Sequence, residues 1–182
     1  MNICKKHPLE KFHFCPECGS PHFEVNDFKS KKCTDCGFVY YFNPSAACVA
    51  IIMTKENELL VARRKNEPAK DTLDLPGGFV DMGETGEEAI KREVKEETGL
   101  TVSFVAPAFT LPNTYLYSGF LVHTLDIFYI CRVSDWRGIH ADDDVADLYL
   151  MPLEELEPED FGLDSIRKGI KMIKEQLSRR RR

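Results

Sequence analysis

The sequence predicts an α/β protein in which helices cover both faces of a mixed sheet, preceded by a small separate N-terminal module. From residue 45 onward, strand-sized apolar segments are mixed with two amphipathic helical segments. The first 44 residues instead hold two Cys-x-x-Cys pairs and show little periodic structure. The composition changes at Asn43 and Pro44, so we expect one unit over residues 1–44 and a second over residues 45–182.

Composition and charge narrow the classes of function. The 182 residues are 43% hydrophobic and 30% charged, which is ordinary for a globular protein. No apolar segment has the length of a membrane span, and residues 1–10 lack the apolar core of a secretory signal, so we expect no membrane partner and a cytoplasmic location. The net charge of −6 argues against general binding to nucleic acid, so we expect no nucleic-acid partner. The Arg179–Arg182 run is interpreted as a solvated helix end, with contact to a phosphate-bearing partner as the alternative.

The paired cysteines predict a metal site in the N-terminal module. Each pair is followed by a glycine, which lets the backbone fold beneath a metal ion. Two such pairs supply the four thiolates that structural zinc prefers, with no position left open for catalysis. We therefore expect a structural Zn²⁺ ion, with a redox or disulfide role as the alternative. The predicted ligands are Cys15, Cys18, Cys33 and Cys36. Possible substitutes, which are better explained as surface or packing residues, are Cys4, His7, His13 and His22.

The second unit is predicted to open with strands. The apolar segment 46–53 is typical of a buried strand, and the polar turn at 55–58 leads into a returning strand at 59–63. Residues 64–72 are polar and contain Pro68, which predicts a loop. A short strand at 73–75 then runs into a turn forced by the Pro-Gly-Gly sequence at 76–78.

Helical signals dominate the following segment. Thr85 and Glu88 have capping-box spacing and Gly99 suits the position after a helix, so we predict a helix at 85–98. Residues 100–106 are expected to be extended, 107–119 to form a loop rich in Pro, Tyr and Asn, and 124–133 to form a strand. A polar loop at 134–144 precedes a strand at 145–151 and a short helix at 152–156. Apolar residues at helical spacing predict the last helix at 163–177.

Three glutamates of the helix predicted at 85–98 share one face. At about 100° per residue, Glu93 lies about 40° from Glu97 and about 60° from Glu96 around the helix axis. Ala89 and Ile90 flank this face, so the three carboxylates crowd beside apolar surface, which is costly for bare anions. Bound Mg²⁺ or Mn²⁺ would relieve the repulsion, because hard divalent cations take carboxylate oxygens. A solvated acidic helix is the alternative. It explains the other acids of this helix but not these three glutamates.

The segment Gly78–Leu100 resembles the Nudix box. That pattern is Gly, five residues, Glu, seven residues, Arg-Glu, an apolar residue, any residue, Glu-Glu, any residue, Gly and an apolar residue. The matching positions are Gly78, Glu84, Arg92, Glu93, Val94, Glu96, Glu97, Gly99 and Leu100. The resemblance extends from about residue 46 to the C-terminus and implies a Nudix-type α/β/α sandwich. The cysteine module resembles the zinc ribbon that precedes some Nudix domains, as in NADH pyrophosphatases.

This resemblance implies a hydrolase that uses Mg²⁺ or Mn²⁺ to cut the pyrophosphate bond of a nucleoside diphosphate linked to another moiety. Glu93 is implied as the group that also orients or deprotonates the attacking water. Arg92 and Glu84 are implied as supporting members of the catalytic set that pair with each other or with the metal-binding acids. The implied metal ligands are Glu93, Glu96, Glu97 and the backbone carbonyl of Gly77.

Further site residues are expected outside the box. Many Nudix enzymes recruit one more acid from a loop, and the Asp142–Asp144 triplet offers candidates, of which we take Asp143 as the ligand; a solvated loop is the alternative. We expect Asp126 to face the pocket and to contact substrate. Tyr115 and Tyr117 are expected to stack on a base, with core packing as the alternative for either ring.

The sequence leaves the substrate open among three classes. NADH pyrophosphatases carry a Ser-Gln-Pro-Trp-type motif downstream of the box, and this chain departs from it with Leu-Pro-Asn-Thr-Tyr at 111–115. Tyr115 and Tyr117 resemble a tyrosine of dinucleoside-polyphosphate hydrolases, and Pro112 resembles a proline of ADP-ribose hydrolases.

A second class of function is a catalytically weak module that senses a nucleotide. Its zinc ribbon would contact nucleic acid or a protein partner through the lysines at 29, 31 and 32. The intact set of acids favours the enzyme, because a sensor could lose those acids without penalty. Relatives that dimerise suggest a homodimer by analogy alone.

Overall fold

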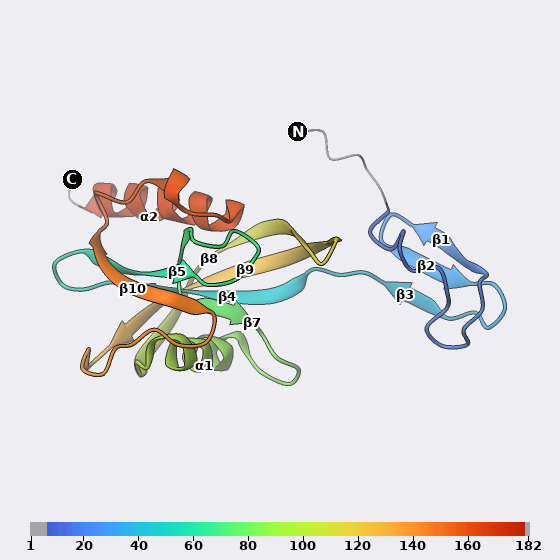
Figure 1. The fold of residues 1–182 in the computed structure, drawn as a ribbon, viewed down its shortest axis with the longest axis horizontal. Helices are drawn as coiled ribbons and strands as arrows, with labels where there is room; N and C mark the ends of the chain where they lie inside the picture. Colours follow the sequence, from blue (N-terminus) through green and yellow to red (C-terminus); the bar gives the residue numbers. More distant parts are fainter. Residues whose placement is uncertain (1–6, 181–182) are drawn as a thin grey trace. The chain divides into compact units, whose positions relative to one another are not determined.

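The computed structural model describes residues 7–180, and their contacts divide the chain into two compact units, Met1–Pro44 and Ser45–Arg182 (Figure 1). Cys4 and the last two residues of the arginine run, Arg181 and Arg182, lie outside the described residues. Within the described part of the chain, no helix combines the length and apolar character that crossing a membrane requires.

The N-terminal unit contains a three-stranded antiparallel sheet. The sequence did not predict these strands, because its apolar residues show little periodicity in this segment. The strands are β1 (Phe23–Asp27), β2 (Ser30–Cys33) and β3 (Val39–Tyr41), in that order across the sheet. The glycine after each cysteine pair donates a hydrogen bond from its amide to the backbone carbonyl of the first cysteine of that pair. The bond from Gly19 to Cys15 is 2.9 Å long, and the bond from Gly37 to Cys33 is 3.0 Å long. The buried core is small, with Phe23 and two cysteines as its members, so hydrophobic burial alone stabilises this unit weakly.

The four cysteine sulfurs gather at one point of this unit. All lie within 4.8 Å of one another, and the Sγ atoms of Cys15 and Cys36 and those of Cys18 and Cys33 are each 3.7 Å apart. A tetrahedron with metal–sulfur bonds of about 2.3 Å has edges of about 3.8 Å. The spacing therefore fits a four-thiolate metal site, and it excludes disulfide bonds within these two pairs, which need about 2.0 Å.

The second unit places two sheets between two helices, with α1 on one side and α2 on the other (Figure 1). One sheet is antiparallel and contains β5 (Glu58–Arg64) between β10 (Val145–Pro152) and β6 (Leu73–Asp74). The other has the order β7 (Gly77–Phe79), β4 (Ser45–Ile52), β9 (Phe120–Val133), β8 (Val102–Tyr117), and is mixed because β4 and β9 are parallel. The helices are α1 (Gly86–Thr98), α2 (Asp164–Arg180) and the short η1 (Pro158–Asp160). The expected mixed sheet covered by helices on both faces is confirmed.

Strand β4 shows why the sheet needs a helix on each face. Successive side chains of a strand point to opposite faces. Val49 and Ile51 belong to the core beneath α2, whereas Cys48, Ala50 and Ile52 belong to the core beneath α1. A strand that is apolar on both faces must be covered on both, which yields the three layers.

The capping box fixes the start of α1 where the sequence predicts it. The Thr85 hydroxyl accepts a hydrogen bond from the amide of Glu88, and the Glu88 carboxylate accepts one from the amide of Thr85 over 2.9 Å. Gly99 ends the helix with a φ of 70°, a left-handed conformation that suits glycine. Both ends of the helix are therefore set by local sequence, which fixes the direction of its glutamate face.

Three segments differ from the sequence prediction. Residues 107–119 do not form a loop, because β8 continues to Tyr117 and turns at Ser118 and Gly119 (φ 48° and 70°) into β9. As an edge strand that pairs with β9 alone, β8 tolerates its two prolines, and a bulge lies between Pro107 and Phe109. Residues 152–156 form the end of β10 and a turn rather than a helix, and Gly77 and Gly78 lie in β7 rather than in a turn.

Replacing Phe128 by Ala tests how much stability the core beneath α2 contributes. Phe128 is fully buried, stacks on Phe109 with ring centroids 4.6 Å apart, and packs against α2 where Gly169 allows the closest approach. We expect Phe128→Ala to lower the free energy of unfolding by about 3–5 kcal/mol, because it leaves a cavity. Urea unfolding followed by the fluorescence of the single tryptophan, Trp136, measures the loss in the second unit. Leu125→Ala on the same strand, where the side chain is 43% exposed, is the matched control and should change the value by less than about 1 kcal/mol. A loss at Phe128 no larger than that of the control would contradict this packing.

Candidate functional site

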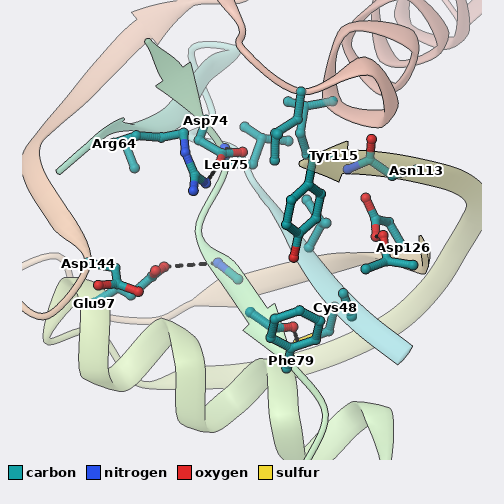
Figure 2. Close-up of a pocket in the computed structure, with 18 of the residues that line it drawn as sticks. Cys48, Arg64, Asp74, Leu75, Phe79, Glu97, Asn113, Tyr115, Asp126 and Asp144 are labelled. Carbon is teal, nitrogen blue, oxygen red and sulfur yellow. Dashed lines mark hydrogen bonds and ion pairs between the residues drawn. The ribbon is translucent and has the colours of Figure 1, made fainter. Parts of the chain in front are cut away.

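A cavity of about 170 Å³ opens beside the C-terminal end of α1 and is bounded by residues of both sheets (Figure 2). That volume is below the several hundred Å³ usual for small-molecule pockets, so the cavity can enclose one part of a nucleotide-sized ligand. Its polar lining residues are Arg64, Asp74, Glu97, Asn113, Tyr115, Thr124, Asp126 and Asp144. An enclosed space with several converging polar groups is the best candidate for a binding site in the described part of the chain.

Glu97 is the acid of α1 that enters this cavity. Its side chain is almost fully buried, and Oε2 accepts a hydrogen bond from the amide of Gly77 over 2.9 Å (Figure 2). Burial raises the pKa of Glu97 to about 9, and the charges of Glu93, Asp74 and Asp144 push it in the same direction. In the absence of a cation, the fold therefore holds this carboxyl in its protonated form at neutral pH.

Glu93 and Glu96 lie beside Glu97 on the same helix and share one cationic partner. Nη1 of Arg92 donates to Oε1 of Glu93 over 2.8 Å and to Oε2 of Glu96 over 3.0 Å. Burial raises the pKa of Glu93 against the opposing effect of Arg92, and the charge of Asp143 adds to the rise. Glu96 is the exposed member, so the three carboxylates run from solvent to the buried edge of the cavity.

Arg92 connects these acids to the loop before the helix. Its Nε and Nη2 donate to the two carboxylate oxygens of Glu84 over 3.0 and 2.9 Å, and Nη2 also donates to the carbonyl of Phe79 over 3.0 Å. The guanidinium lowers the pKa of Glu84. Arg92 and Glu84 thus pair with each other, and Arg92 also pairs with two of the predicted metal-binding acids, as expected from the resemblance.

Two glycines let the backbone of β7 pass close to its neighbours, which are an acid of α1 at Gly78 and the backbone of β4 at Gly77. A Cβ on Gly78 would lie 2.5–2.7 Å from the carboxylate atoms of Glu93, and a Cβ on Gly77 would lie 2.1 Å from the carbonyl oxygen of Cys48. Any side chain at either position would displace the strand or the carboxylate. These close approaches are the local reason for glycine at the first position of the box and at the position before it.

The aspartate loop is held against the same end of α1. The amide of Asp142 donates to the carbonyl of Glu97 over 3.1 Å, and Oδ1 of Asp144 accepts from Nδ2 of Asn66 over 2.7 Å. Asp144 lines the cavity, whereas Asp143, the residue expected from the sequence, is not part of the lining and acts on Glu93 through its charge. The sequence triplet predicted the loop but not which member enters the cavity.

The rest of the wall contains residues that the sequence analysis did not single out. Nη1 of Arg64 pairs with Oδ2 of Asp74 at 2.5 Å, and burial raises the pKa of Asp74. The sequence predicts a loop around Asn113 and a strand that begins at Thr124, and neither prediction indicates that these two side chains face a cavity. Of the three substrate contacts expected from the sequence, Asp126 and Tyr115 line the cavity, and Tyr117, which is 56% exposed, does not.

The donor set fits hard divalent cations. Carboxylates of one helical face, a loop acid and the backbone near Gly77 offer oxygen atoms, which Mg²⁺ and Mn²⁺ prefer. Arg92 forms the ion pairs of Glu93 and Glu96, and its side chain is not part of the cavity lining. Glu97 has no positively charged partner among the described residues. Buried carboxylate oxygens without a cation are suited to accept one.

Comparison with known proteins identifies the family of this chain. The NUDIX domain family matches residues 43–170. The ADP-ribose pyrophosphatase of Methanocaldococcus jannaschii is 55% identical over 60 residues, which are 33% of this chain and 35% of that protein. The NAD-capped RNA hydrolase NudC of Haemophilus influenzae is 33% identical over 123 residues, 63% of this chain and 45% of that protein. The chain thus spans less than half the length of these relatives.

Solved structures share the fold. A NUDIX hydrolase from Nitrosomonas europaea superimposes with a TM-score of 0.67 at 20% identity, over 87% of this chain and 88% of that one. The NUDIX domain of Shewanella oneidensis NrtR, solved with ADP ribose, gives a TM-score of 0.62 at 20% identity over 75% and 90% of the two chains. Because the family match covers most of the sequence, including the whole glutamate helix, the chain belongs to the NUDIX domain family.

Proposed function

We propose that this protein hydrolyses the pyrophosphate bond of a nucleoside diphosphate linked to another moiety, with Mg²⁺ or Mn²⁺ as the cofactor. The observation that carries the proposal is the burial of Glu97 at the cavity edge beside Glu93, with no cationic partner for Glu97 among the described residues. A scaffold that only needed a stable helix would place these acids in solvent, because their burial is costly.

The residues that would hold the cations are Glu93, Glu96, Glu97, the carbonyl of Gly77 and an acid of the 142–144 loop. When bound, Mg²⁺ or Mn²⁺ supplies charge neutralisation for the phosphate oxygens and makes a water molecule more acidic. Arg92 holds Glu93 and Glu96 in place from the solvent side, and Glu93, which is partly buried, is positioned to accept the proton of the attacking water. The Gly77 amide orients Glu97 through its hydrogen bond.

For the substrate we propose a compound of the ADP-ribose or NADH type, with dinucleoside polyphosphates as the third class. The similarity to an ADP-ribose pyrophosphatase and to an NAD-capped RNA hydrolase supports the first two. The cavity encloses one end of such a molecule, and the pyrophosphate would lie toward α1. Tyr115 brings an aromatic ring to the cavity wall for a base, and Asp126 brings a carboxylate.

For the N-terminal unit we propose a structural Zn²⁺ ion held by the four cysteines. The Sγ separations of 3.7 Å support it, as does the small core of this unit. The unpaired thiols are compatible with the reducing cytoplasm that we expect for this protein.

Replacing Glu97 by Gln should lower kcat/KM for ADP-ribose or NADH by at least about 100-fold, because changes even one shell away from a metal cost 10–100-fold. Phosphate release after coupling to a phosphatase measures the rate. Glu87→Gln makes the same chemical change on an exposed part of α1 and should leave the rate within about twofold of the wild type. Equal rates for wild type and Glu97→Gln would remove the catalytic assignment, and a wild type without activity on any nucleoside-diphosphate compound would favour the nucleotide-sensing alternative.

Cation binding should release a proton from Glu97. Because the pKa of this carboxyl is raised to about 9, the group is protonated at pH 7, and a cation must displace that proton. We therefore expect the apparent affinity for Mg²⁺ to rise with pH up to about 9 and to fall as the pH is lowered. Calorimetry of Mg²⁺ binding at pH 7 in buffers of different protonation enthalpy measures the release, which Glu97→Gln should abolish. A binding enthalpy independent of the buffer would contradict this prediction.

Removal of metal should unfold the N-terminal unit and leave the second unit folded. The N-terminal unit has a small core, so its roughly forty residues depend on the metal for their stability. Treatment with a chelator, or the substitution Cys33→Ser, should collapse the dispersed amide signals of residues 7–44 in a two-dimensional NMR spectrum while those of 45–180 stay in place. Substitution of Cys48, which belongs to the other unit, is the control and should leave the N-terminal signals unchanged. Intact N-terminal signals after complete metal removal would show that the module folds without the ion.

A further inference from the structure

Three polar side chains of β8 and β9 face the cavity although the fold buries them. The antiparallel register pairs Asn113 with Thr124 and Leu111 with Asp126. Residues two apart on a strand point to the same face, so these side chains share the sheet face that lines the cavity. Asn113 is 5% exposed, Thr124 3% and Asp126 4%. Within residues 7–180 every fully buried side-chain nitrogen or oxygen has a hydrogen-bond partner, so any free hydrogen-bonding position of these three residues opens to the cavity.

Asn113 presents unused donors to the cavity. Its Oδ1 accepts a hydrogen bond from the amide of Thr114 over 2.9 Å, and no acceptor for its Nδ2 is found within residues 7–180. The amide nitrogen carries two N–H donors. Figure 2 shows this nitrogen on the side of the amide that faces Tyr115. Since the residue lines the cavity, these donors are available to a ligand there.

Asp126 presents unused acceptor capacity at the same wall. Oδ1 accepts from the Thr124 hydroxyl and Oδ2 from the Ser165 hydroxyl, each over 2.5 Å. A carboxylate can accept about four hydrogen bonds, so about two positions remain. Within the described residues Asp126 forms no ion pair, and the nearby guanidinium of Arg64 is bound to Asp74. These remaining acceptor positions open to the cavity, where a donor group of a ligand can occupy them.

We propose that this wall is a binding site for a planar group that carries an exocyclic amine beside a hydrogen-bond acceptor. The carboxylate of Asp126 would accept from the amine, and the amide of Asn113 would donate to the neighbouring acceptor. Tyr115 lies two residues from Asn113 on β8 and brings an aromatic ring to the same cavity. The inference rests on the proposed function, since it assigns one end of a nucleotide substrate to this cavity.

Two parts of such a substrate carry this chemistry, the adenine amino group with its adjacent ring nitrogen and the carboxamide of nicotinamide. Figure 2 shows Asn113 and Asp126 on one side of the cavity and Glu97 and Asp144 on the other. A group bound at the first side thus leaves room for a diphosphate to extend toward the acids of α1. Asp126 also joins β9 to the first turn of α2 through Ser165, but a role in folding alone would not discriminate between ligands.

Discrimination between matched substrates tests this site. We would compare kcat/KM for ADP-ribose with that for inosine diphosphate ribose, in which the amine is an oxo group, and for NAD with that for its deamido form, in which the carboxamide is a carboxylate. The wild type should prefer the amine-bearing member of at least one pair by about tenfold or more, because a site built for a hydrogen bond rejects the analogue that lacks it. The pair that shows the preference identifies which group occupies the wall.

Asp126→Asn should reduce that preference to within about threefold, because the neutral amide oxygen accepts a weaker hydrogen bond than the carboxylate does. Asp164→Asn makes the same change at an exposed position of α2 next to Ser165 and should keep the preference of the wild type. Each ratio is measured within one variant, so a partly unfolded sample alters both rates equally. If Asp126→Asn does not fold, Asn113→Ala tests the same wall through its donor. The inference is overturned by a wild type without preference in either pair, or by a preference that survives both substitutions.

Binding separates this inference from the proposed function. Calorimetry with the four compounds and Glu97→Gln in the presence of Mg²⁺ reports affinity without requiring turnover. Absence of hydrolysis by the wild type would end the proposed function, whereas a binding preference for the amine-bearing compound that Asp126→Asn removes would still support the site. Equal affinities for both members of each pair would overturn the site even in an active enzyme.

Discussion

Repulsion among carboxylates that the fold shields from water is the constraint on which the second unit depends. Glu97 is buried at the cavity edge, and the charges of Glu93, Asp74 and Asp144 all raise its pKa. The fold answers this repulsion only in part, with one amide hydrogen bond to Glu97 and with Arg92 on the solvent side of Glu93. The remaining electrostatic cost is the physical basis for assigning divalent cations to this place.

The architecture keeps these acids together through regular elements and a loop that is hydrogen-bonded to α1. The capping box and Gly99 fix both ends of α1, and the apolar side of that helix packs on β4, so the glutamate face has one orientation. Gly78 lets β7 lie against the carboxylate of Glu93, and the aspartate loop is bonded to the last turn of the helix. Site residues supported by a helix and a sheet are held more precisely than residues on free loops.

Local signals in the sequence predicted the parts of the molecule that local physics determines. The cap residues, the spacing of the glutamates and the glycine after each cysteine pair act over a few positions, and the structure contains the helix and the sulfur cluster that they predict. Strand β8 was missed because its Pro, Tyr and Asn residues favour a loop locally, whereas its pairing with β9 is a contact distant in sequence. Asn113 was missed with it. The placement of Asp144 rather than Asp143 in the cavity depends on how the loop bonds to Glu97, which no spacing of residues encodes.

The most direct test of the central claim is the position of a bound cation. Crystals grown with Mn²⁺ and measured at a wavelength where manganese scatters anomalously locate the ion without reference to activity. We expect anomalous density among the carboxylates of Glu93, Glu96 and Glu97, at the edge of the cavity that Glu97 lines. Density only at other surface acids, with these three side chains still bound to Arg92 and to the amide of Gly77, would contradict it.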